Sequence, residues 1–123
     1  MADPEDFQAR LKVLSDAYAA QLPEKLEQIE QAWSQLHRSE WDETGFQTLH
    51  RMVHSLTGAG KMFGFALLSD VARNLEDYLK EFAQSKTVSD EEQNKRVQVL
   101  LSKLHQVAIR RDASAGDQSG GSG

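Results

Sequence analysis

Two histidines, one lysine and three glycines lie within fifteen residues of this 123-residue chain, between His50 and Gly64. An imidazole has an ordinary pKa near 6.5, so at neutral pH it offers an unprotonated nitrogen that can act as a nucleophile or a metal ligand. Each glycine inside a helix costs about 1 kcal/mol relative to alanine, so glycines seldom gather there without a reason. The segment is therefore the strongest candidate for a functional site.

Helical periodicity predicts where the side chains of this segment point. At about 100° per residue, the apolar positions share one side, which we expect to face the core. These positions are Phe46, Leu49, Val53, Leu56 and Gly60. His54 lies about 120° from the centre of that side, so we expect it to be exposed. Around it on the helical wheel lie Gln47, His50, Arg51, Thr57, Gly58 and Lys61.

The residues after His54 suit a nucleophile that accepts a phosphoryl group from another protein. Gly58, four positions on, has no side chain to block an approaching partner. Lys61, seven positions on, can place an ammonium group near the phosphoryl oxygens, and Thr57 can donate a hydroxyl hydrogen bond. Because phosphoryl transfer depends mainly on positioning and charge neutralisation, we expect a phosphocarrier without catalysis of its own rather than an enzyme.

The elements that position this histidine follow from the apolar pattern. A stripe with steps of three or four runs from Phe7 through Leu14 to Leu36, and predicts a long first helix. Pro23 predicts that this helix is kinked or split. Three further helices follow, without strand-like alternation, so the fold class is all-α, an antiparallel four-helix bundle.

Capping patterns predict the helix boundaries. Three pairs of residues have the pattern of helix starts: Asp3 with Pro4, Thr44 with Gln47, and Ser89 with Glu92. We expect the second helix to end near Met62, because Gly64 breaks its helical periodicity. Arg110 and Arg111 are expected in the last turn of the fourth helix, where they favour the negative end of its dipole.

The composition of the chain limits the kind of protein and the partners that it can have. Hydrophobic residues make up 39% and charged residues 27%, as in an ordinary globular domain. The net charge of -5 disfavours a nucleic-acid partner, and no apolar run approaches the roughly 20 residues of a membrane span. The absence of cysteine and the acidic N-terminus fit a cytoplasmic chain without membrane insertion. We expect a bundle over residues 1–111 and a flexible Gly/Ser-rich tail over 112–123, in a monomer or a module of a larger protein.

The segment His54 to Gly58, with Phe63-Gly64, resembles the signature around the phosphorylated histidine of histidine-containing phosphotransfer (HPt) domains. In that signature a lysine lies at plus three from the histidine, glycines lie at plus four and plus ten, and a glutamate lies on the following helix. The matching positions are Gly58, Gly64 and, on the following helix, Ala72 with Leu75-Glu76. The resemblance covers roughly residues 7–109.

The resemblance implies a bundle whose two central helices form a hairpin, one of them bearing His54. It implies reversible phosphorylation at Nε2 by the phospho-aspartate of a response-regulator receiver domain, with a hybrid sensor kinase as another candidate partner. Mg²⁺ would be held by the receiver, so we expect no cofactor in this chain. From wheel positions, the expected docking surface comprises Gln47, His50, Arg51, Gly58, Met62 and Phe65.

Two other interpretations stay open. Thr57 replaces the usual lysine at plus three, so either Lys61 compensates or the chain is a docking module that is no longer phosphorylated. His50 and His54, four positions apart, are also compatible with two metal ligands. No Glu-x-x-His motif on another helix pairs with them, as di-iron bundles require, so we expect no metal site.

Overall fold

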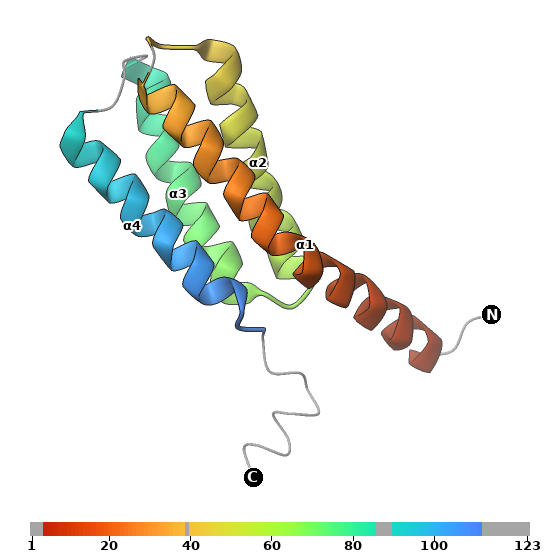
Figure 1. Ribbon diagram of the computed structural model, residues 1–123. Coiled ribbons are helices and arrows are strands. Elements are labelled where there is room, and N and C mark those ends of the chain that lie inside the picture. The colour runs from red at the N-terminus through yellow and green to blue at the C-terminus, as the bar shows by residue number, and fades with distance from the viewer. Residues whose placement is uncertain (1–3, 39, 86–89, 112–123) are drawn as a thin grey trace.

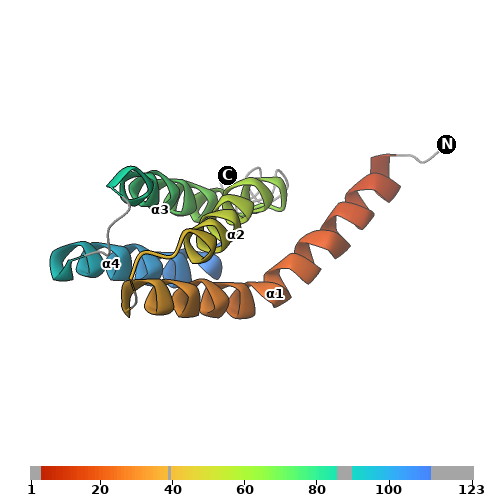
Figure 2. The ribbon, with the colours of Figure 1, turned by 90° about the horizontal axis from the view of Figure 1, so that it is seen from above.

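The structure is a computed structural model, and it describes residues 4–38, 40–85 and 90–111. These residues form four helices, α1 (Pro4–Arg38), α2 (Glu43–Met62), α3 (Ala66–Ser85) and α4 (Glu91–Ala108) (Figure 1). Each helix packs against two neighbours, and the α2–α3 contact is the most extensive. Figure 2 shows α1 and α4 in one layer and α2 and α3 in the other. The predicted antiparallel four-helix bundle is confirmed.

The core receives apolar side chains from all four helices. The predicted apolar side of α2 is confirmed, because Phe46, Leu49, Val53 and Leu56 are all buried. Gly60, on the same side, is buried too, and a β-carbon there would lie only 3.4 Å from the backbone oxygen of Phe65. A β-carbon there would thus be in van der Waals contact with the start of α3, which shows how closely α2 and α3 pack at this point.

The first helix is kinked and continuous. Pro23 lies inside α1, which runs unbroken from Pro4 to Arg38 and bends visibly between its two halves (Figure 2). A proline in a helix interior removes one backbone donor and crowds the carbonyl four residues earlier, which accounts for a kink without a break. Of the two predicted outcomes, kinked or split, the structure has the first.

The N-terminal part of α1 extends beyond the ends of the other helices (Figure 1). The predicted apolar stripe is buried at Tyr18 and Leu22, but Phe7 is 65% exposed and Leu14 is 54% exposed. The stripe therefore faces the core only in its later part, and its first part is exposed. Periodicity defines the apolar face of a helix, but it does not show whether another element is long enough to cover it.

Both predicted capping boxes are wrong. The residue before α2 is Asp42, which makes no side-chain capping bond, and Thr44 lies inside the first turn. Gln47 instead donates a side-chain hydrogen bond to the carboxylate of Glu43, 2.9 Å away. The start of α4 does have a capping box, but it is formed by Asp90 and Gln93, one position later than predicted. Ser89 lies outside the described residues.

The position predicted for Arg110 and Arg111 is also wrong, because α4 ends at Ala108. Arg111 lies beyond the helix and returns to α1, where its guanidinium contacts Asp16 at 2.7 Å and donates to the Ser15 carbonyl at 3.1 Å. The contact joins the end of the described chain to the first helix.

Gly64 makes the connection between α2 and α3. Its φ of +89° lies in the left-handed region that favours glycine, and the Phe65 N–H donates to the Gly60 carbonyl at 2.7 Å. Ser69 Oγ donates to the Thr57 carbonyl at 2.5 Å, which ties the two helices together. The predicted helical hairpin is thereby present, and it brings α3 alongside the face of α2 that carries His54.

Candidate functional site

His54 lies in the middle of α2, on the side away from the bundle core. Its side chain is 70% exposed, as the helical wheel predicts. The backbone around it is regular helix, so the direction of the imidazole is set by a rigid element. The ring is therefore open to a second molecule.

The carboxylate of Glu76, on α3, lies beneath this ring. Nδ1 of His54 is 2.7 Å from Oε2 of Glu76, a short charge-assisted hydrogen bond. An ionised carboxylate only accepts hydrogen bonds, so the proton of the neutral imidazole is on Nδ1 and the lone pair is on Nε2. The contact assigns the tautomer that leaves Nε2 free to act as a nucleophile.

Glu76 is buried, with 9% of its side chain exposed. A buried carboxylate is costly unless it receives hydrogen bonds, and α2 provides the contacts that the structure shows. Its Oε2 atom faces His54, and its Oε1 atom lies 3.3 Å from the hydroxyl of Thr57. The carboxylate is thus held between the two central helices.

Thr57 is buried, so its predicted place on the exposed flank is wrong. On the helical wheel Thr57 lies at the edge of the face that carries His54, and α3 covers this edge. The apolar pattern of α2 alone does not show that another helix packs there. Its hydroxyl lies 3.3 Å from Glu76 and also 3.3 Å from the Val53 carbonyl. As the structure stands, Thr57 contacts the carboxylate rather than the solvent in front of His54.

His50 lies one turn before His54 and is partly buried, with 26% of its side chain exposed. Its ring is nearly parallel to that of His54, at 11° and 6.3 Å between centroids. On its other side the Phe46 ring lies 5.9 Å away at 23°. The expected place of His50 at the rim of the docking surface agrees with this partial exposure.

The other predicted residues divide into two groups. Exposed on the His54 side of α2 are Gln47, Arg51, Gly58, Lys61 and Met62. Phe65 is not exposed: it is 1% accessible, and its ring packs 6.0 Å from that of Tyr18. Its inclusion in the docking surface is therefore wrong, because Phe65 follows the Gly64 turn and no longer shares the α2 wheel.

Gly58 leaves open space next to His54. A β-carbon built on it meets no other atom within 4 Å, apart from the helix backbone and its chain neighbours. The absence of a side chain therefore has no packing explanation inside this chain. It leaves the surface one turn after the histidine bare.

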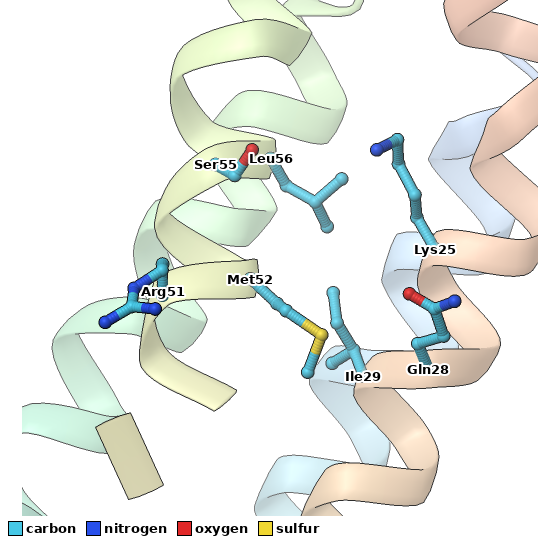
Figure 3. A pocket seen from close by; sticks show the side chains of 7 residues that line it. All are labelled: Lys25, Gln28, Ile29, Arg51, Met52, Ser55 and Leu56. Carbon is cyan, nitrogen blue, oxygen red and sulfur yellow. The ribbon is translucent and has the colours of Figure 1, made fainter. Parts of the chain in front are cut away.

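A groove of about 170 Å³ lies between α1 and α2, beside this surface (Figure 3). Ile29 on α1 faces Met52 and Leu56 on α2, and these side chains give the groove an apolar floor. Lys25 and Gln28 border it on α1, and Arg51 and Ser55 border it on α2. His54 does not line this groove, and its side chain is exposed to solvent.

Metal ligation has little support in the geometry. Within residues 4–38, 40–85 and 90–111, no three histidine, cysteine or acidic side chains are grouped as a metal site requires.

The same residues contain no helix that is long and apolar enough to span a bilayer.

In the sequence, Glu76 matches the family signature on the following helix, but it was assigned no role at the site. The signal was present, because Glu76 interrupts the apolar face that α3 forms with Ala72, Leu75 and Leu79. A charged residue on a buried face is seldom tolerated without a partner. That partner could not be identified until the packing of α3 on α2 was known.

Comparison with known families identifies the family of this chain. A family model described as the Hpt domain matches residues 13–109, which is most of the chain and includes all of α2 and α3. No curated protein and no solved structure matches the chain.

Proposed function

The chain belongs to the Hpt domain family, whose members transfer phosphoryl groups through histidine in two-component phosphorelays, and from this we propose that His54 is its phospho-acceptor. The group would be accepted from, and returned to, aspartates of receiver domains. The observation that carries the proposal is the 2.7 Å contact between Nδ1 of His54 and Glu76, beneath an imidazole that is otherwise open.

The proposed step needs no proton to leave the imidazole. Nε2 attacks phosphorus, the N–P bond forms, and the bond from phosphorus to the aspartyl oxygen breaks, so that the aspartate departs as a carboxylate. The imidazole ring gains positive charge while Nδ1 keeps its proton. Glu76 accepts the hydrogen bond throughout and stabilises this charge. Because the proton stays in place, the reverse step follows the same path.

The open surface around His54 supports a macromolecular donor. A small substrate is usually held in a concave pocket, whereas the groove between α1 and α2 does not contain His54. A receiver domain brings its own aspartate and the Mg²⁺ that neutralises phosphoryl charge, so this chain needs to supply only the nucleophile. The bare surface at Gly58 would let the receiver approach the imidazole closely.

Lys61 is the proposed phosphoryl-stabilising residue. It is exposed and lies seven positions after His54, about 10 Å further along the helix axis. Side chains on a helix lean toward its N-terminus, so this position would let the ammonium group of Lys61 reach back toward His54. Thr57 occupies the position where the family signature has lysine and contacts Glu76 instead. Lys61 would thus take over the cationic role.

The docking surface extends from His54 to both sides. Gln47 and Met62 mark its two ends along α2, and Met62 is 68% exposed although apolar. Arg51 borders both this surface and the groove between α1 and α2. We assign these exposed residues, with His50 at the rim, to the recognition of the receiver.

The test is phosphoryl transfer from a receiver domain labelled with radioactive acetyl phosphate and Mg²⁺. The proposal expects label on this chain that is acid-labile and alkali-stable, and none on the His54→Gln variant. His105→Gln is the matched control, because His105 also pairs with a glutamate, Glu30 at 3.1 Å, but lies on α4. Receivers that bind without labelling any histidine would instead support the unphosphorylated docking module.

A further inference from the structure

His50 has a buried nitrogen that the proposed reaction does not use. Its Nε2 atom is inaccessible to solvent and makes no hydrogen bond within the described residues. The nearest charged group that the structure shows is Oε2 of Glu76, 3.5 Å away. That oxygen is the same one that accepts the hydrogen bond from Nδ1 of His54. Two histidines therefore converge on one carboxylate oxygen.

The geometry assigns the proton of the His50 ring. If Nε2 were unprotonated, its lone pair would face an ionised carboxylate in a buried environment, which is repulsive. A proton on Nε2 turns the same contact into an attraction, and a carboxylate oxygen has two lone pairs to accept both histidines. At 3.5 Å the contact is longer than a regular N–H···O bond, so it acts electrostatically and shortens with a small ring movement.

The carboxylate would be poorly fixed without this contact. Thr57 contacts Oε1, at 3.3 Å, and this contact does not restrain Oε2, the oxygen that His54 itself contacts. His50 approaches Oε2, and its own ring is held between Phe46 and His54 in a nearly parallel stack. The two contacts restrain the carboxylate at both oxygens, in the orientation that places Oε2 beneath His54.

We infer that His50 is a positioning residue for the phospho-acceptor: through Glu76 it locks His54 in the tautomer with the proton on Nδ1. The effect of His50 on phosphorylation rests on the proposed function. Its effect on the tautomer of His54 does not depend on phosphorylation. His50 itself does not contact the phosphoryl group. Its effect reaches Nε2 of His54 through the shared carboxylate.

The test compares His50→Leu, which removes the N–H group, with His50→Gln, which keeps an amide N–H group. The ¹⁵N shifts of the His54 imidazole at neutral pH report its tautomer directly. The wild type and His50→Gln should show mainly the Nδ1–H form, and His50→Leu a mixture of both forms. Phosphorylation of His54 by phosphoramidate, a small donor that needs no docking surface, should be about three- to tenfold slower in His50→Leu, because without the electrostatic contact to Glu76 part of the His54 population takes the other tautomer; this factor corresponds to about 0.7–1.4 kcal/mol.

His105→Leu is the matched control, since it removes a histidine that faces a glutamate away from the site. It should leave the His54 tautomer and the phosphorylation rate unchanged. A His50→Leu protein with the wild-type tautomer would overturn the inference, whatever its phosphorylation rate. If the wild type is not phosphorylated at all, the proposed function fails, and the tautomer measurement still decides the role of His50.

Discussion

Nδ1 of His54 lies 2.7 Å from Oε2 of Glu76, which is 22 positions further along the chain and on the next helix. The contact joins an exposed imidazole to a buried carboxylate, so one end of the ring is fixed and the other is open. This relationship gives the histidine a defined tautomer before any partner arrives.

Glu76→Gln keeps the shape of the side chain and removes its charge. We expect phosphorylation of His54 by phosphoramidate to slow about 10- to 100-fold, because a hydrogen bond to a charged group contributes about 1.5–3 kcal/mol. Initial rates measured by phosphate-affinity electrophoresis check this. Asp77→Asn, which removes the exposed carboxylate next in sequence, should leave the rate unchanged. Equal rates for wild type and Glu76→Gln would show that the carboxylate does not assist the step.

Gly58→Leu separates docking from chemistry. The added side chain meets open space in the free protein and replaces a helical glycine, so we expect the free energy of unfolding to rise by up to about 1 kcal/mol. Transfer from a phosphorylated receiver should fall at least about tenfold, because the leucine side chain would stand where the receiver approaches. A tenfold fall corresponds to about 1.4 kcal/mol of lost interface energy.

Phosphorylation of Gly58→Leu by phosphoramidate should remain at the wild-type rate, because this donor needs no docking surface. Gly58→Ala is the matched control, with a smaller addition and a smaller loss of transfer. Unimpaired transfer to Gly58→Leu would mean that the receiver does not approach over this position.

Lys61→Ala tests the cationic contribution. We expect the transfer rate from a receiver to fall about three- to tenfold, the effect of losing roughly 0.7–1.4 kcal/mol of charge stabilisation. The difference should shrink at high salt, because exposed charges are screened. Quenched-flow transfer assays at two ionic strengths measure both effects. Lys103→Ala, on α4, is the control, and an equal loss in that variant would rule out a specific role for Lys61.

Arg111→Ala tests the link between the end of the bundle and α1. Hydrogen bonds from Lys12 and then from Arg111 hold the pKa of Asp16 below its usual value of 3.8. Asp16 is therefore favoured as a carboxylate in the folded chain, and this stabilisation is present above pH 4 and lost as pH falls through the folded pKa. Removing Arg111 should raise the pKa of Asp16 toward 3.8, measured by carboxyl ¹³C titration. A titration identical to the wild type would contradict the contact.

The position of His54 could be predicted from the sequence because it depends on one helix. Glycine spacing and the apolar positions of α2 suffice to place the histidine opposite the core, and the structure has it there. The kink at Pro23 is likewise a local property of α1. Such features follow from residues that are neighbours along the same helix.

The errors that concern burial and the site come from contacts between helices. Thr57 and Phe65 were expected at the surface, but α3 covers the first and the second turns inward after Gly64. Phe7 belongs to the apolar stripe of the first helix, but it is exposed because no described helix extends far enough to cover it. The role of Glu76 needed the register between α2 and α3, which a single sequence does not contain.

The most direct test of the account is the identity of the nitrogen that carries phosphorus. After phosphorylation, ³¹P–¹H and ¹⁵N NMR of the imidazole distinguish the two phosphohistidine isomers. Because Glu76 occupies Nδ1 of His54, we predict a single Nε2-phosphohistidine at position 54. An Nδ1-phosphohistidine, or phosphorus on another histidine of the chain, would contradict the account.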